Sequence, residues 1–91
     1  SYILAAEIYY RRAQFKECAA EYSAAIKLRP NSAELYVKAS TCYRNSDAVE
    51  IAEDMLAMAM ERESGFADIY REMGYIYEKK GDKFKAVENF E

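Results

Sequence analysis

Residues 70–77, Tyr-Arg-Glu-Met-Gly-Tyr-Ile-Tyr, have counterparts 34 and 68 residues earlier in the same chain. Tyrosine occupies both ends of all three copies, as Tyr2, Tyr36 and Tyr70 at the first position and Tyr9, Tyr43 and Tyr77 at the last. Self-similarity at a period of roughly 20 to 50 residues is typical of stacked repeat units, each of which buries its apolar face against its neighbours. We therefore interpret the 91-residue chain as a tandem repeat.

Around these copies, apolar residues recur at the spacing of helix faces. The predicted helices lie at about 2–11, 15–28, 33–44, 48–63, 66–80 and 83–91. Pro30, Gly65 and Gly81 interrupt the pattern between helices, and Asn31 and Asp47 are the expected N-caps of the helices that follow them. No stretch alternates apolar and polar residues over several positions, as a strand would. The fold class predicted is all-α.

The overall charge and composition exclude several classes of function. The net charge of −3 offers no broad attraction for phosphate backbones or anionic lipid, so neither nucleic acid nor a membrane surface is an expected partner. No apolar run approaches the roughly 20 residues that span a bilayer, so membrane insertion is not expected. The chain has no histidine and no glycine-rich phosphate loop. We therefore expect no enzyme activity, no bound metal and no cofactor.

The two cysteines, Cys18 and Cys42, lie among apolar or small residues and lack the short paired spacing of a zinc site or redox motif. Buried free thiols are the prediction, and a disulfide between the two is the alternative. Among compartments, the cytoplasm is favoured.

The stretch from Tyr70 to Tyr77 resembles the signature of the tetratricopeptide family: an aromatic residue, a large apolar residue followed by glycine, and a tyrosine. The second half of the signature is matched in the three copies by Cys18 and Tyr22, by Ala52 and Leu56, and by Ala86 and Phe90. The resemblance covers essentially the whole chain. It implies a single domain, residues 1–91, with repeats at about 1–32, 33–66 and 67–91, the last one truncated. It also implies tandem helix-turn-helix hairpins stacked as a right-handed α-solenoid.

Each signature position has a packing role in such a stack. Small residues at Ala6, Ser40 and Gly74 are expected to let the two helices of each hairpin approach closely, and Cys18, Ala52 and Ala86 do so from the opposing helix. We expect Tyr9, Tyr43 and Tyr77 to be buried between helices.

In the first helix of each repeat, one stripe of residues keeps its chemistry between copies and another does not. Members of the variable stripe are three or four positions apart, so they share a helix face. In the tetratricopeptide family this face lines a concave groove that holds extended peptides or partner helices. The resemblance therefore implies a protein-binding scaffold whose groove is lined by Ile3, Glu7, Tyr10, Glu34, Val37, Lys38, Thr41, Arg44, Arg71, Tyr75 and Glu78, with Asp68 and Glu72 beside them.

Tyr10, Val37 and Tyr75 are the expected apolar anchors of this groove. An ordinary solvated helix face is the alternative interpretation of the same stripe. Family members that grip the acidic carboxyl terminus of heat-shock chaperones use basic and amide side chains here. This chain has Ile3, Glu7, Lys38, Asp68 and Glu72 at the matching positions, so that function is not expected.

Two rival surfaces remain. Residues 48–63 carry an excess of carboxylates, of which Glu61 and Glu63 lie too far from the helix start to be explained by the helix dipole. Alternatively, the chain is a structural module that stacks or forms homo-oligomers through uncapped terminal repeats, because Phe84, Val87 and Phe90 in the truncated last helix have no following hairpin to cover them.

Overall fold

The computed structural model describes the backbone of residues 1–90 and the side chains of residues 1–81. Its helices are α1 (Tyr2–Arg11), α2 (Phe15–Leu28), α3 (Ala33–Asn45), α4 (Val49–Arg62) and α5 (Ala67–Phe90). Residues 1–90 contain no strand, so the predicted all-α fold class is confirmed. Within the described part of the chain, no helix is both long enough and apolar enough to cross a membrane.

Serine side chains cap the starts of α1 and α3. The hydroxyl oxygen of Ser1 accepts a hydrogen bond from the amide of Leu4 at 3.2 Å, and that of Ser32 accepts one from the amide of Leu35 at 3.4 Å. The prediction that Asn31 caps α3 is wrong. Ser32 has the extended backbone that an N-cap requires, with φ −87° and ψ 101°, and Asn31 lies in the preceding turn.

The turns between α1 and α2 and between α3 and α4 have the same geometry. Ala13 and Asp47 both adopt left-handed backbone conformations, with φ of 58° and 68°. The amide of the next residue in each turn donates to the carbonyl of Tyr9 or of Tyr43, at 2.9 Å in both cases. Asp47 was the predicted N-cap of α4, but the structure places it in this turn, and Ala48 occupies the cap position without a side-chain hydrogen bond.

The 34-residue period of the sequence is also a period of the backbone. Helix α2 begins at Phe15 and α4 begins at Val49, 34 residues later, and both helices contain 14 residues. The same step separates two tyrosine hydrogen bonds: the hydroxyls of Tyr36 and Tyr70 each donate to the carbonyl six residues earlier, at 2.9 Å. Equivalent residues therefore fold alike.

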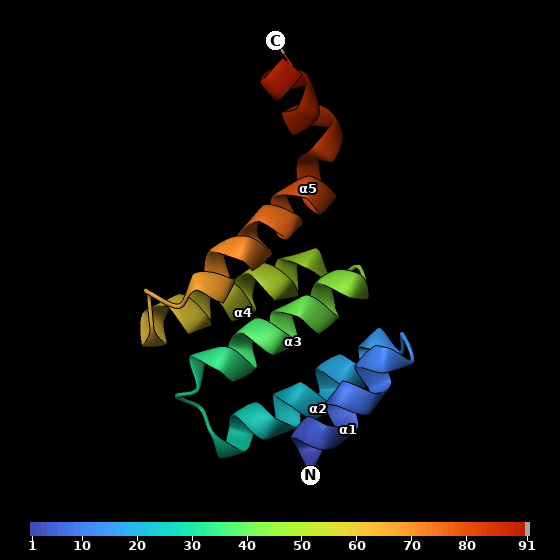
Figure 1. The fold of residues 1–91 in the computed structure, drawn as a ribbon, viewed down its shortest axis with the longest axis vertical. Coiled ribbons are helices and arrows are strands. Elements are labelled where there is room, and N and C mark those ends of the chain that lie inside the picture. Colours follow the sequence, from blue (N-terminus) through green and yellow to red (C-terminus); the bar gives the residue numbers. More distant parts are fainter. Residues whose placement is uncertain (91) are drawn as a thin grey trace.

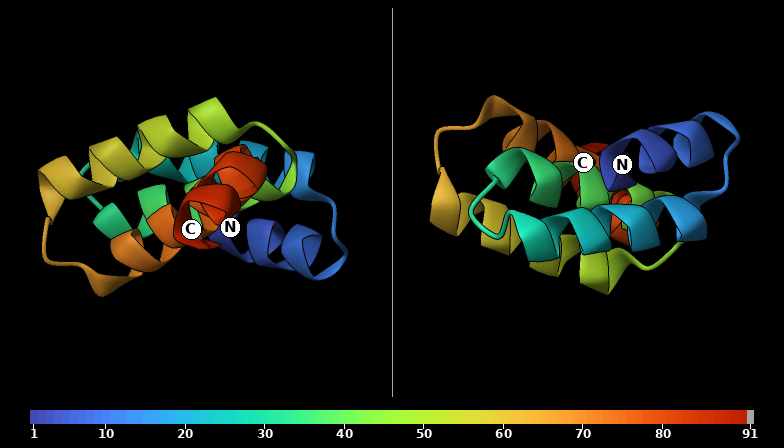
Figure 2. Two further views of the ribbon diagram at one scale, coloured as in Figure 1. Left: turned by 90° about the horizontal axis from the view of Figure 1, so that it is seen from above. Right: turned by 90° about the horizontal axis from the view of Figure 1, so that it is seen from below.

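The helices follow one another along the long axis of an elongated molecule (Figure 1). Contacts join α1 to α2, α2 to α3, α3 to α4, and α5 to both α3 and α4. Seen along the long axis, α2 and α4 lie on one side of the molecule, and α1 and the first half of α5 lie on the other (Figure 2). This division separates the odd-numbered helices, on which the variable stripe lies, from α2 and α4.

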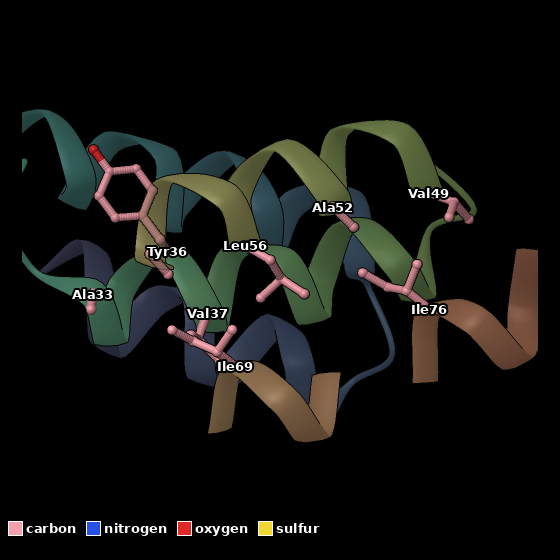
Figure 3. Packing of buried hydrophobic residues seen from close by; sticks show 9 residues of the cluster. Ala33, Tyr36, Val37, Val49, Ala52, Leu56, Ile69 and Ile76 are labelled. Atoms are coloured by element: carbon pink, nitrogen blue, oxygen red, sulfur yellow. The ribbon is translucent and has the colours of Figure 1, made fainter. Parts of the chain in front are cut away.

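Two clusters of buried side chains form the core. One lies among α1, α2 and α3, and the other lies among α3, α4 and α5, where Val37, Leu56 and Ile69 converge (Figure 3). Tyr43 contacts both clusters, and its hydroxyl is hydrogen-bonded to that of Ser23 at 2.9 Å, which links α3 to α2. The core is therefore continuous between the units.

Close approach of the helices within each hairpin is confirmed for the first two units. Ala6 faces α2, Ser40 faces α4, and both are completely buried, as are their counterparts Cys18 and Ala52. The hydroxyl of Ser40 donates to the carbonyl of Ala52 at 2.9 Å, so the two backbones are nearly in contact. A larger side chain at either position would force the helices apart, at a cost of about 1–3 kcal/mol.

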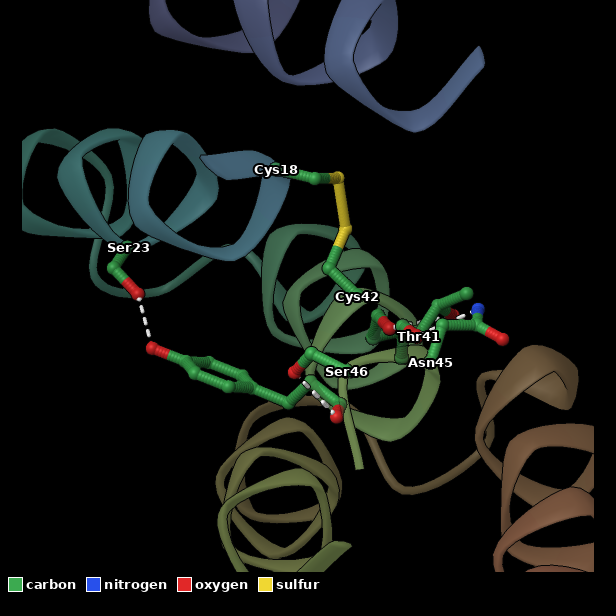
Figure 4. The surroundings of a disulfide bond; sticks show 8 residues. Cys18, Ser23, Thr41, Cys42, Asn45 and Ser46 are labelled. Carbon is green, nitrogen blue, oxygen red and sulfur yellow. Dashed lines mark hydrogen bonds between the residues drawn. A yellow bond between two sulfur atoms is a disulfide. The ribbon is translucent and has the colours of Figure 1, made fainter. Parts of the chain in front are cut away.

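The predicted free thiols are absent from the structure, because Cys18 and Cys42 form a disulfide (Figure 4). Cys18 lies on α2 and Cys42 on α3, and their Cα atoms are 5.9 Å apart, within the usual range for disulfides. Both residues occupy inward positions on adjacent helices, so packing brings their side chains together. The sequence separation of 24 residues does not reveal that distance.

The third unit differs from the prediction. Instead of a turn at residues 81–82 and a separate sixth helix, α5 continues to Phe90 with a kink at Gly81. The structure thus has two helical hairpins followed by α5. Tyr77 is 53% exposed, so its predicted burial is wrong, while the equivalent Tyr9 and Tyr43 are half-buried. The side chains of Phe84, Val87 and Phe90, predicted to be uncovered, lie outside the described part.

Candidate functional site

A concave pocket of about 450 Å³ lies across the face made by the odd-numbered helices. Helix α3 contributes most of its wall, α1 and α5 flank it, and single residues come from α2 and from the turn before α5. The lining residues are Tyr10, Tyr22, Glu34, Val37, Lys38, Thr41, Cys42, Arg44, Phe66, Asp68, Arg71, Glu72 and Tyr75. We call this surface the α3 pocket.

The structure brings most of the predicted groove residues together here. Eight of them line the α3 pocket: Tyr10, Glu34, Val37, Lys38, Thr41, Arg44, Arg71 and Tyr75. Three predicted residues do not. Ile3 is half-buried against the first core cluster, and Glu7 and Glu78 are exposed on α1 and α5 without lining the pocket.

Arg44, Glu72 and Tyr75 form a fixed element of the pocket wall. The Arg44 Nε donates to Glu72 Oε1 at 3.1 Å, and the two side chains are only 16% and 4% exposed. The guanidinium carbon of Arg44 also lies 4.8 Å from the centre of the Tyr75 ring, which adds a cation–π contact. The pair connects α3 to α5, so it holds the two walls in register. Its charges are already satisfied within the protein.

Arg71 and Asp68 form a second ion pair on α5, and this pair is open to solvent. Their closest atoms are 3.4 Å apart, and the side chains are 59% and 42% exposed. An exposed pair of this kind contributes only about 0–1 kcal/mol to stability. Its partners can therefore exchange each other for a charged ligand at small cost.

Glu34 and Lys38 lie one helical turn apart on α3. Glu34 is exposed, Lys38 is half-exposed, and neither forms an ion pair with another residue in the described part of the chain. The hydroxyl of Thr41, one turn further on, donates back to the Val37 carbonyl at 3.2 Å. The charged groups of α3 that remain open to a ligand are therefore one carboxylate and one ammonium.

Aromatic side chains provide most of the apolar surface of the pocket. Tyr10 and Tyr75 are both exposed, and the Tyr10 ring makes an edge contact with Phe15, with centroids 5.6 Å apart. Val37 was predicted as a third anchor, but it is buried in the core and presents little surface. Phe66, which precedes α5, takes part in the lining instead.

Tyr22 and Phe66 were not among the predicted site residues. Tyr22 lies on α2, whose aromatic residues the repeat pattern assigns to the core, and it is indeed buried. It reaches the pocket because it packs beneath α3. Burial raises the pKa of the Tyr22 hydroxyl above its ordinary value, and the nearby carboxylates of Glu7 and Glu34 raise it further. The pocket is thus more negative toward α1.

The outer acidic surface on α4 is partly explained by contacts with α5. The Lys80 ammonium binds the Glu53 carboxylate at 3.0 Å, and that of Lys79 binds Asp47 at 2.8 Å. The Asp47 contact lowers the pKa of that carboxyl through the hydrogen bond and the charge of the lysine. Glu61 approaches Arg62 at 3.5 Å. Within residues 1–81, no group of histidine, cysteine or acidic side chains is arranged to hold a metal ion.

No family model matches the chain, and no curated protein matches it either.

Proposed function

We propose that this chain is a protein-protein interaction scaffold that binds a peptide or a partner helix in the α3 pocket. One observation carries the proposal. Residues chosen from the sequence only because they vary between repeats come from three helices, and eight of them line a single concave surface. An ordinary solvated face has no reason to be hollowed where the variable positions meet.

The proposed architecture is a short array of tetratricopeptide-like hairpins stacked as a right-handed α-solenoid. Three repeated features support it: the signature residues at steps of 34, the equal bounds of α2 and α4, and the left-handed turns at Ala13 and Asp47. In such an array the first helix of each hairpin faces the concave side. The positions of α1, α3 and α5 around the pocket agree with this arrangement.

The charges and rings of the pocket favour a ligand of mixed character. Tyr10 and Tyr75 offer exposed rings, and tyrosines at interfaces often supply a large share of binding energy. Lys38 and Arg71 would bind acidic side chains of the ligand, whereas Glu34 would bind a basic one. We therefore expect a segment with one or two apolar or aromatic residues between charges of both signs. The proposal includes no enzymatic activity and no nucleic-acid partner.

The volume of the pocket fits a few side chains of a ligand rather than a whole domain. About 450 Å³ falls within the usual range for binding pockets, about 300–1,000 Å³. Arg44 and Glu72 hold the walls at a fixed spacing, so little ordering of the protein would accompany binding.

Selection of peptides from a displayed random library tests the proposal. The double variant Arg71→Ala/Tyr75→Ala removes an exposed cation and an exposed ring, so it should weaken binding of the selected peptides at least about 30-fold. The control variant Glu61→Gln/Glu63→Gln changes two residues on the outer helix side and should bind them normally. Normal binding by the first variant together with loss in the second would place the binding surface on α4.

A further inference from the structure

One face of α5 lacks the cover that its counterparts on α1 and α3 have. Ala6 and Ser40 occupy equivalent positions in the first two units and are completely buried. The third member of this series, Gly74, is exposed, and a Cβ atom added to it would meet no other described atom within 4 Å. Tyr77, one turn further along the same helix, is more exposed than the equivalent Tyr9 and Tyr43. We call this surface the Gly74 face.

In the first two units the covering element is the second helix of the hairpin. Helix α2 lies on Ala6 with Cys18, and α4 lies on Ser40 with Ala52, whose carbonyl accepts the Ser40 hydrogen bond. The 34-residue step leads from Ala52 to Ala86. Residues 83–91 therefore carry the third copy of the covering sequence, with a small residue at Ala86 and a large apolar residue at Phe90.

In the structure, however, the chain does not make the turn that would bring this segment back onto its own α5. The first two hairpins turn through left-handed residues, Ala13 and Asp47. The equivalent residue, Gly81, has φ −129° and ψ 26°, so the backbone kinks without reversing. Helix α5 then leads away from α3 and α4 (Figure 1).

An apolar hollow extends the Gly74 face toward α4. It has a volume of about 240 Å³, and its lining includes Leu56, Met60, Met73, Ile76 and Tyr77. Apolar surface of this kind is normally covered by another element or by a partner.

We propose that the Gly74 face binds residues 83–91 of a second copy of the chain, and that the exchange is reciprocal. The continuous α5 carries this segment away from its own unit, while the same sequence is the one that the repeat pattern matches to the face. Exchange of identical elements between two copies recreates the contacts of a closed hairpin and gives a closed, two-fold dimer. This contact uses a surface different from the α3 pocket, so both can be occupied at once.

Two substitutions at the kink distinguish exchange from other forms of association. Gly81→Ala favours an uninterrupted helix because alanine has the higher helix propensity, so it should tighten the dimer by about tenfold. Lys83→Pro disfavours an uninterrupted helix, but proline is well tolerated at the first residue of a new one. Residue 83 corresponds to Phe15 and Val49, the first residues of α2 and α4. The Lys83→Pro variant should therefore be monomeric with its helix content nearly unchanged.

A third substitution tests the face itself. Gly74→Arg introduces a bulky charge where close approach is needed, yet within one copy the described structure leaves room for it. The matched control is Gly65→Arg, at an open position in the turn before α5, which changes the net charge equally.

Sedimentation equilibrium of the 91-residue chain decides the question, with circular dichroism as the check that each variant is folded. We expect a dimer for the unmodified chain and for Gly65→Arg, and a monomer for Gly74→Arg and Lys83→Pro. A monomeric unmodified chain at every accessible concentration would overturn the proposal. So would a dimer that survives Lys83→Pro, because a simple contact between two faces needs no continuous α5.

Discussion

The Arg44→Met substitution should be among the most destabilising changes on the concave side of the protein. Arg44 neutralises Glu72, whose side chain is only 4% exposed, and no other basic group in the described part of the chain forms an ion pair with it. Removal of one partner of a buried ion pair costs about 3–5 kcal/mol, since the remaining charge is left without compensation. Because Arg44 itself is 16% exposed, we expect a loss near the lower end, about 3 kcal/mol.

This loss is a large part of the total stability. A chain of 91 residues is expected to be stable by roughly 5–14 kcal/mol, at about 0.05–0.15 kcal/mol per residue. For a domain of this size, 1 kcal/mol shifts the midpoint of thermal unfolding by about 4–8 °C. The variant should therefore unfold at least about 12 °C below the unmodified protein.

The chain contains a matched control for this prediction. Arg71→Met makes the same chemical change on the same side of the protein, but the Arg71–Asp68 pair is exposed and should contribute less than about 1 kcal/mol. Urea denaturation followed by circular dichroism measures both losses. The double variant Arg44→Met/Glu72→Met should recover most of the stability, because both charges are removed together. Equal losses in the two single variants would refute the view that burial makes the Arg44–Glu72 pair important.

Three further results are expected. Tyr43→Ala should cost about 2–3 kcal/mol of unfolding free energy because the ring is half-buried, whereas Tyr77→Ala at the equivalent position should cost under about 1 kcal/mol; urea denaturation of the two variants measures the contrast. Reduction of the Cys18–Cys42 disulfide, followed by thiol labelling and thermal melting, should expose two thiols and lower stability by about 3 kcal/mol, as closure of a loop of this length predicts, and two thiols reactive before reduction would contradict the disulfide. Because the folded-state pKa of Asp47 is lowered by an α5 lysine, its contribution to stability is present above the unfolded-state pKa and is lost as pH falls through the lowered value; Asp47→Asn should thus be less stable than the unmodified chain at neutral pH and converge with it on acidification, and a difference that persists in acid would argue against the ion pair.

Most of the helical architecture was predictable from the sequence. The period of 34 residues located both hairpin turns, and the small residues at Ala6 and Ser40 marked the close helix contacts, because packing constraints recur wherever the same unit recurs. Prediction failed at α5, where the same reasoning placed a turn at residues 81–82. Glycine permits a left-handed turn but does not enforce one, so Gly81 is compatible with either path of the chain.

The candidate site was predictable to a similar extent. Helical spacing identified Lys38, Arg71 and Tyr75 as members of one face, and they line one pocket. Spacing could not reveal that Val37 points into the core, or that Tyr22 reaches the pocket from α2, since both depend on how neighbouring helices cross. The disulfide escaped prediction for the same reason. A pattern along the chain reports on faces of single helices and not on distances between helices.

The most direct test of the proposed binding function is a nuclear magnetic resonance titration of the 15N-labelled chain with a peptide selected from the displayed library. If the peptide occupies the α3 pocket, the largest amide shifts should map to Tyr10, Lys38 and Thr41 and to Arg71 and Tyr75, on three separate helices. Amides on the outer face of α4, around Glu61, should remain nearly unchanged. Shifts confined to α4 while the α3 pocket stays silent would contradict the account.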